Sequence, residues 1–201
     1  MSAVRAPAAP KRAGRFFDRT LGTEVVKILP GEFHVTGEDI GIITVLGSCV
    51  AACIWDERAH VGGMNHFMLP DGGGGDGTDS SARYGLFAME VLINELLKGG
   101  AKRERLKAKV FGGGRVLKGM TSLNVGERNA RFVVQYLKME GIPIVSQDLE
   151  DDYARKVAFM PRTGVAKMKK IESDASEVLE SEKAYNRTLE KKPVSGDIEL
   201  F

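Results

Sequence analysis

Residues 46–69 read LGSCVAACIWDERAHVGGMNHFML, and this stretch decides how the chain folds around a candidate site. Residues 45–55 are almost all apolar, a polar break follows, and residues 61–68 are apolar again. The pattern predicts two adjacent strands joined by a short connection. If the strands are antiparallel neighbours, Cys49 and His66 lie within a few residues of the same register, and directly facing side chains are about 5 Å apart.

Cys49 and His66 are the residue types of a nucleophile and its base. A free thiol has a pKa of about 8.5, and a nearby imidazolium favours the thiolate that attacks carbonyl groups. Gly47 and Ser48 precede the cysteine, and backbone N–H groups beside a nucleophile commonly bind the developing oxyanion. The alternative is that Cys49 is a small buried hydrophobic residue.

The runs LGSCVAACIWD and GGMNHFMLPD resemble the active-site signature of the CheD family, bacterial chemoreceptor glutamine deamidases. The similarity continues in the same order through YGLFAMEVLINELLKGGA, AKVFGGG, VGERNARFVVQYLKMEGIPI and RKVAFMPRTG, and it covers roughly residues 32–170. It implies hydrolysis of glutamine side-chain amides on the cytoplasmic helices of chemoreceptors, which gives glutamate and ammonia. It also implies the layered deamidase-type fold.

The resemblance implies three catalytic positions. The nucleophile falls on Cys49 and the histidine on His66. A threonine that orients the histidine falls at Ile43 by the commonest family spacing, whereas this chain has Thr44. A slip of one residue in a regular strand turns a side chain to the other face, so we expect Thr44 to serve only if a bulge near Gly47 restores its direction.

A metal site is the other chemistry that these residue types allow. Cys49, Cys53, His60 and His66 could in principle act as ligands, but their spacing matches no standard zinc pattern. We expect Cys53 to lie in the core and His60 in a turn. We therefore expect neither a metal nor a cofactor.

Composition indicates a cytoplasmic globular protein. The 201 residues are 43% hydrophobic and carry a net charge of +2, which gives no reason to expect nucleic acid or an anionic membrane as a partner. No run approaches the roughly 20 apolar residues of a membrane span. Two cysteines and the lack of a signal peptide are typical of a reducing cytoplasm.

The chain divides into three expected parts. Residues 1–21 are predicted to be a disordered basic tail, residues 22–170 the folded domain, and residues 171–201 a charged tail that is disordered or marginally helical. Apolar residues recur at helical spacing in residues 84–97, and residues 156–168 have the pattern of a hairpin. Many connections are too short for repeated crossovers, so we expect an α/β sandwich with a mixed sheet packed against helices.

Two details outside the signature also carry expectations. Glu150 and Asp151 stand where many members of the family have a glycine pair, so this loop is expected to differ in shape. Asn129 stands near the start of the second predicted helix, where it could cap the helix or help to hold a carboxamide.

Three functions fit the sequence. The resemblance favours a receptor glutamine deamidase whose partners are chemoreceptor helices. A cysteine hydrolase acting on receptor glutamate methyl esters would use the same Cys49 and His66. An adaptor that binds a CheC-like phosphatase without turnover would need neither residue, so their presence argues against a pure adaptor.

Overall fold

The computed structural model describes residues 14–70, 78–116, 125–171 and 176–191. The strands are β1 (Arg15–Asp18), β2 (Thr23–Lys27), β3 (Phe33–Thr36), β4 (Gly41–Leu46), β5 (Val50–Asp56), β6 (Val61–Asn65), β7 (Lys107–Gly112), β8 (Ile144–Leu149), β9 (Ala154–Met160) and β10 (Val165–Ile171). The helices are α1 (Thr78–Lys98), α2 (Val125–Met139) and α3 (Ser176–Lys191), with a short 3₁₀ helix η1 (Arg103–Arg105).

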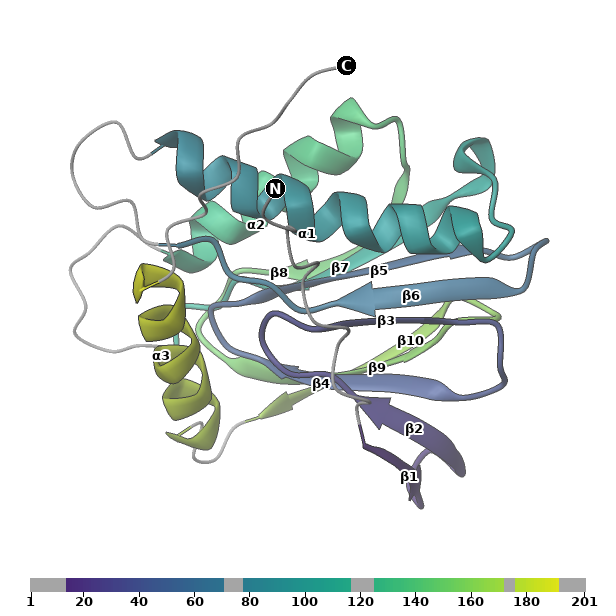
Figure 1. The fold of residues 1–201 in the computed structure, drawn as a ribbon. Coiled ribbons are helices and arrows are strands. Elements are labelled where there is room, and N and C mark those ends of the chain that lie inside the picture. Colours follow the sequence, from purple (N-terminus) through teal and green to yellow (C-terminus); the bar gives the residue numbers. More distant parts are fainter. Residues whose placement is uncertain (1–13, 71–77, 117–124, 172–175, 192–201) are drawn as a thin grey trace, which may run out of the picture.

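The strands form two five-stranded sheets that pack face to face (Figure 1). The outer sheet has the order β1-β2-β4-β9-β10, and the central sheet has the order β3-β6-β5-β7-β8. Both sheets are mixed, because β2 pairs in parallel with β4 and β7 with β8, while the other pairs are antiparallel. Helices α1 and α2 cover the free face of the central sheet. The predicted α/β sandwich is confirmed, with two mixed sheets where one was expected.

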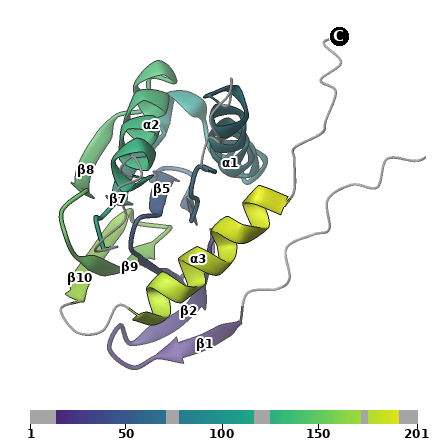
Figure 2. The same cartoon turned by 90° about the vertical axis from the view of Figure 1, so that its left-hand side faces the viewer.

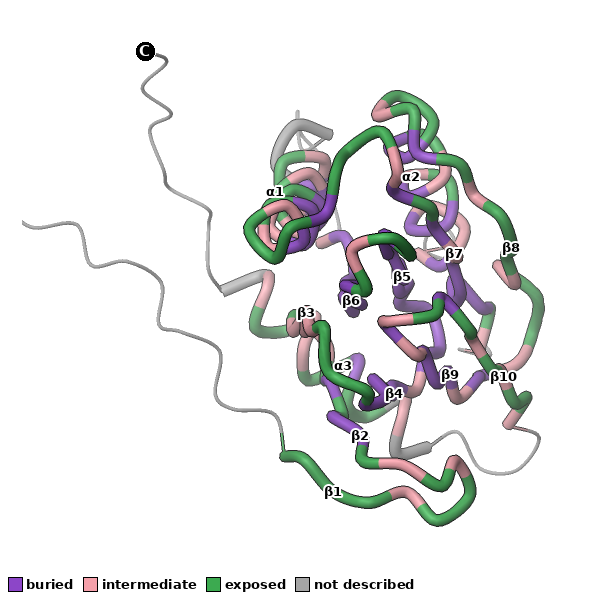
Figure 3. The backbone as a smooth tube through the Cα atoms, turned by 90° about the vertical axis from the view of Figure 1, so that its right-hand side faces the viewer, coloured by how far each residue is buried: buried purple, intermediate pink, exposed green. Residues whose placement is uncertain are grey.

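Strand β5 lies in the middle of the molecule and is buried on both faces (Figure 3). Ala52 and Ile54 belong to the core between the central sheet and the helices. Ala51 and Cys53 belong to the core between the two sheets, so Cys53 is a core residue as predicted. A strand buried on both faces shows a continuous apolar run instead of alternation.

The single strand predicted over residues 45–55 is wrong in one respect. The chain leaves the outer sheet at the end of β4, turns through residues 47–49, and enters the central sheet as β5. The predicted antiparallel pairing of β5 with β6 is confirmed, and the bridge between Val50 and Phe67 continues its register. This register sets His66 opposite Ala51, two residues from Cys49.

Other expected elements are present with shifted ends. Strands β9 and β10 form the predicted hairpin. Helix α1 contains the predicted residues 84–97 and begins earlier, at Thr78. Glu150 and Asp151, which stand where many members of the family have a glycine pair, have φ angles of 64° and 70°. Glycine adopts such values most easily. No described helix is long and apolar enough to cross a membrane.

The two expected tails contain structure. Strand β1 lies inside residues 1–21 and pairs with β2, so the folded part begins before residue 22. Helix α3 lies inside residues 171–201 and crosses the end of the two sheets (Figure 2). Residues 1–13 and 192–201 lie outside the described residues.

Asp56 at the end of β5 organises the turn that leads to β6. Its buried carboxylate accepts hydrogen bonds from the backbone N–H groups of Arg58, Ala59 and Lys102, at 3.0, 3.2 and 2.9 Å. The Arg105 guanidinium adds an ion pair at 2.6 Å. Burial alone would raise the pKa of Asp56, but the hydrogen bonds from Arg105 and the backbone lower it to about 2.

We predict that Asp56→Asn destabilises the fold by about 2 kcal/mol, because it removes a buried charge and leaves Arg105 without its partner. A depressed pKa gives stability that is complete above the ordinary value of 3.8 and is lost as the pH falls through about 2. Urea unfolding at pH 7 and at pH 2.5 measures both effects. Glu57→Gln, at an exposed neighbouring position, is the matched control and should change stability by less than about 0.5 kcal/mol. Equal stability of Asp56→Asn and wild type at pH 7 would contradict the prediction.

Candidate active site

The turn at residues 47–49 presents Cys49 at the junction of the two sheets. Two backbone hydrogen bonds fix the carbonyl groups of the turn, from Gly113 N to Cys49 O and from Gly114 N to Gly47 O, both at 2.8 Å. Gly112 has a φ of 114°, and a Cβ there would lie 2.1 Å from Cys49 O. The glycine run that begins at the last residue of β7 therefore lets the backbone hold the turn at close range. The Cys49 side chain is fully buried.

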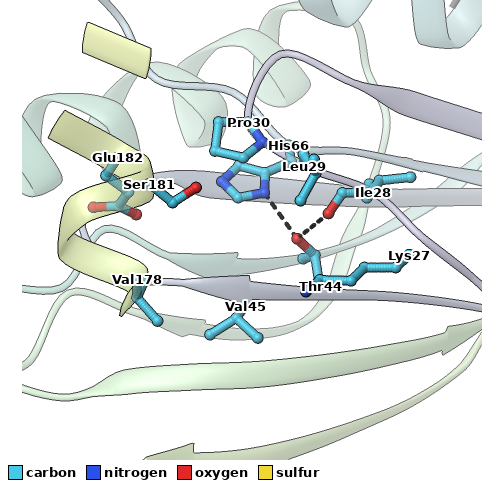
Figure 4. A pocket seen from close by; sticks show the side chains of 10 residues that line it. All are labelled: Lys27, Ile28, Leu29, Pro30, Thr44, Val45, His66, Val178, Ser181 and Glu182. Carbon is cyan, nitrogen blue, oxygen red and sulfur yellow. Dashed lines mark hydrogen bonds between the residues drawn. The ribbon is translucent and has the colours of Figure 1, made fainter. Parts of the chain in front are cut away.

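His66 follows β6, and its backbone is held by the loop before β3. Gly31 N donates to His66 O at 2.7 Å, and His66 N donates to Glu32 O at 2.9 Å. The His66 Nδ1 atom lies 2.8 Å from Thr44 Oγ1 (Figure 4). The Thr44 hydroxyl donates its one proton to Ile28 O at 2.9 Å, so it accepts from Nδ1–H. This tautomer leaves His66 Nε2 with a lone pair.

Thr44 faces His66 without the bulge that was expected to be needed. The pairing of β4 with β9 runs in continuous register from Ile42 to Leu46. Thr44 is 1% exposed and lies in the middle of this segment. The position of the histidine after β6, and not a distortion of β4, brings the two side chains into contact. The orienting role of Thr44 stays a prediction.

Glu182 of α3 occupies the space in front of the turn. Its Oε1 atom accepts hydrogen bonds from the N–H groups of Gly47 and Cys49, at 2.9 and 3.0 Å. Its Oε2 atom accepts from Ser48 N at 2.9 Å and from Ser48 Oγ at 2.7 Å. Three consecutive backbone N–H groups thus converge on one carboxylate beside the cysteine. This is the donor arrangement that stabilises an oxyanion.

Cys49, His66 and Glu182 are also residue types that bind metals. Their candidate ligand atoms all lie within 4.8 Å of one another, and neither Cys53 nor His60 belongs to this group. Both Glu182 oxygens, however, face N–H donors, whose partial positive charge favours an anion over a cation. The side chains present therefore fit oxyanion binding, and we assign no metal to them.

Burial controls the protonation of Cys49 and His66. It raises the pKa of the Cys49 thiol well above its ordinary value, and the negative charge and hydrogen bond of Glu182 raise this pKa further. Burial lowers the pKa of His66 to about 4, an effect that the charge of Glu182 opposes. Thiol and imidazole are therefore both uncharged at neutral pH in this state. Thiolate formation is disfavoured while Glu182 stays beside the sulfur.

A cavity of about 130 Å³ lies beside the histidine, between β4, the segment after β2, and α3. Its lining includes Thr44, His66, Val178 and Ser181. The imidazole ring stands between Thr44 on one side and α3 on the other (Figure 4). Among the described residues, buried His66 Nε2 has no hydrogen-bond partner. The cavity admits several water molecules.

Reasoning from the sequence missed Glu182 and expected other roles for Asn129. Glu182 follows Cys49 by 133 residues. The sequence does contain one sign of its role. Glu182 stands four residues after Val178 and three before Tyr185, so an acidic residue interrupts the apolar stripe of this helix. Asn129 was noted, but with other roles. It lies buried within α2, accepts from Leu69 N and donates to Ser48 O, both at 2.9 Å, and so ties the 47–49 turn to the segment after His66.

A family profile and similar sequences indicate one family. The profile described as CheD chemotactic sensory transduction matches residues 68–170. The "Probable chemoreceptor glutamine deamidase CheD" of Janthinobacterium sp. (strain Marseille) is 55% identical over 189 residues, which cover 92% of this chain and 93% of the relative. The protein of the same description from Methylobacillus flagellatus is 54% identical over 190 residues, which cover 92% and 94%.

Among solved structures, Neisseria meningitidis protein NMB0706, from the family DUF152, matches over 66% of both chains with 10% identity and a TM-score of 0.42. The relatives, by contrast, are similar over 92% of this chain. The unmatched part is shorter than residues 44–66, so the similarity must include at least some of the segment that holds Thr44, Cys49 and His66. From the family profile and these relatives, we conclude that the chain belongs to the CheD family.

Proposed function

We propose that this protein is a chemoreceptor glutamine deamidase, which converts glutamine side chains on the cytoplasmic helices of chemoreceptors to glutamate. The CheD relatives, which are described as probable chemoreceptor glutamine deamidases, support this assignment. The observation that carries it is the convergence of three N–H groups, from residues 47–49, on a carboxylate beside Cys49. A carboxylate is the product of the reaction, and its negatively charged oxygen occupies the place that the oxyanion would take in front of these donors.

The first half of the reaction forms a thioester. The Cys49 thiol gives its proton to His66 Nε2, and Sγ attacks the carboxamide carbon of the substrate glutamine. The N–H groups of residues 47–49 stabilise the negative charge on the carbonyl oxygen. His66 then returns the proton to the amide nitrogen, the C–N bond breaks, and ammonia leaves.

The second half consumes one water molecule. His66 Nε2 takes a proton from water, and the hydroxide oxygen attacks the thioester carbon. The C–S bond breaks and the proton returns to sulfur, which leaves glutamate and the free enzyme. The cavity between Thr44, His66 and α3 lies on the side from which this water can approach. Thr44 keeps the proton on Nδ1, so that Nε2 is the basic atom in both steps.

Two alternative functions are a methylesterase and an adaptor. A methylesterase would apply the same thiol and oxyanion donors to glutamate methyl esters and release methanol. An adaptor for a CheC-like phosphatase would bind a partner without turnover. We place the protein in the cytoplasm, where the receptor helices lie, and treat receptor binding as its main interaction.

The test is to incubate the purified protein with a chemoreceptor cytoplasmic fragment and to measure ammonia and methanol release separately. The deamidase proposal predicts ammonia, in proportion to the glutamine converted. Methanol release without ammonia would support the esterase instead. A stable complex that yields neither product would support the adaptor. Alkylation of Cys49 that stays slow in Glu182→Ala, where no carboxylate lies beside the sulfur, and that does not depend on His66 would also support the adaptor.

A further inference from the structure

The inward face of α3 carries a buried acidic residue in its centre. Val178, Tyr185 and Leu189 are partly buried at helical spacing and form an apolar stripe, in which Val178 lines the cavity beside His66 and Tyr185 packs against the core between the sheets. Glu182 lies within this stripe and is 3% exposed. Glutamate is almost never fully buried unless its charge is paired, so its partners indicate what holds it there.

The partners of Glu182 come from the predicted oxyanion site. Among the described residues, Glu182 accepts hydrogen bonds from the three backbone N–H groups of residues 47–49, from the Ser48 hydroxyl and from the Cys49 thiol. A structural glutamate buried in a helix interface would be expected to meet a lysine or arginine. Glu182 instead meets the donors that bind a reacting carbonyl oxygen, with the Cys49 sulfur close by.

The domain surface is shaped for this helix. A Cβ at Gly47 would lie 2.8 Å from Val116 Cγ2 and 2.9 Å from Glu182 Oε2, so a side chain there would push the carboxylate or its neighbour aside. A Cβ at Gly31 would lie 2.5 Å from the Tyr185 hydroxyl. The Tyr185 hydroxyl also hydrogen-bonds to that of Tyr84 at the side of α1. Glycines therefore permit close approach at two positions one helical turn apart on α3.

Together these contacts define a groove that accepts a helix and draws one glutamyl side chain to the catalytic donors. We propose that α3 occupies the docking site of the substrate helix, with Glu182 in the place of the glutamate that the reaction produces. This inference rests on the proposed function, because it takes the substrate to be a glutamine on a helix. Helix α3 then competes in cis with the receptor helix and must leave before the receptor binds.

The placement has a chemical consequence for Glu182→Gln. A glutamine at this position would set its carboxamide carbon near Cys49 Sγ, with the carbonyl oxygen facing the N–H groups of Gly47 and Cys49. The C–S bond would form, the C–N bond would break, and ammonia would leave with the proton from His66. Water would then hydrolyse the thioester and regenerate glutamate. The enzyme would thus deamidate its own residue 182.

The experiment is peptide mass spectrometry of the full-length Glu182→Gln protein after purification. We expect residue 182 to be about 1 Da heavier than glutamine, as glutamate, and we expect Cys49→Ala/Glu182→Gln to retain glutamine. Glu180→Gln is the matched control, since Glu180 lies two residues away on the exposed face of α3. It should retain glutamine, as should exposed Gln135 on α2.

Glu182→Ala provides a second readout that does not depend on self-deamidation. Because the carboxylate no longer competes for the N–H groups, we expect receptor deamidation to be about 5-fold faster or more at subsaturating receptor. Iodoacetamide should also alkylate Cys49 faster than in Glu180→Ala.

The outcomes separate this inference from the proposed function. Receptor deamidation by wild type, with glutamine retained in Glu182→Gln and no acceleration in Glu182→Ala, would overturn the placement of α3 and leave the function standing. Failure of both the receptor reaction and self-deamidation, in variants with the wild-type melting temperature, would overturn both.

Discussion

Cys49→Ala is expected to lower the rate of receptor deamidation by about 10³-fold or more, because the remaining groups can bind the amide but cannot form the thioester. The turn at residues 47–49 should keep its shape, since its carbonyl groups are held by the backbone of Gly113 and Gly114 and not by the thiol. The measurement is the initial rate of ammonia release at fixed receptor concentration.

Cys53→Ala is the matched control for this variant. Cys53 is also fully buried, lies four residues later on β5, and packs between the two sheets. Its loss should reduce stability by about 1 kcal/mol and leave the rate per folded molecule unchanged. If Cys49→Ala released ammonia at the wild-type rate, or if Cys53→Ala were as inactive as Cys49→Ala, the thiol mechanism would be refuted.

His66→Asn is expected to lower kcat by about 10²- to 10⁴-fold, the usual contribution of a general acid–base group. Asparagine is smaller, and it cannot transfer a proton to the departing amide nitrogen or take one from water. Thr44→Val should lower kcat by about tenfold with little change in KM, because it removes only the hydroxyl that holds the proton on Nδ1.

Combining the two substitutions shows whether Thr44 acts by orienting His66 or through an independent effect on the fold. If Thr44 acts through His66, the double variant should be no slower than His66→Asn alone, since effects of residues that act as a unit do not add. Thr44→Ser keeps the hydroxyl and should restore most of the activity. A double variant whose loss is the product of the two single losses would contradict a positioning role for Thr44.

The pairing of the β5 and β6 segments was predictable because it depends on a local pattern. Two apolar runs with a short polar connection define antiparallel neighbours, and this pairing brings Cys49 and His66 to one end of the hairpin. The break between β4 and β5 was not predictable from polarity, since residues on both sides are buried. Only the Gly47-Ser48 pair indicates that the chain changes sheets there.

The contribution of α3 could not be derived from the sequence around Cys49. It depends on a contact across 133 residues, and the composition of residues 171–201 is that of a solvated tail. The interruption of the apolar stripe at Glu182 is a real signal, but its meaning requires the position of the 47–49 turn. Thr44 shows the same limit, because the location of His66 after β6 decides which side chain of β4 it meets.

The central claim is that Cys49 hydrolyses glutamine side chains on a receptor helix. Its most direct test is peptide mass spectrometry of a chemoreceptor cytoplasmic fragment after incubation with wild type or with Cys49→Ala, in water enriched in ¹⁸O. We predict that wild type converts defined glutamines to glutamate carrying one ¹⁸O atom, and that Cys49→Ala converts none of them. Unchanged glutamines after incubation with a wild-type protein that binds the fragment, or equal conversion by Cys49→Ala, would contradict the claim.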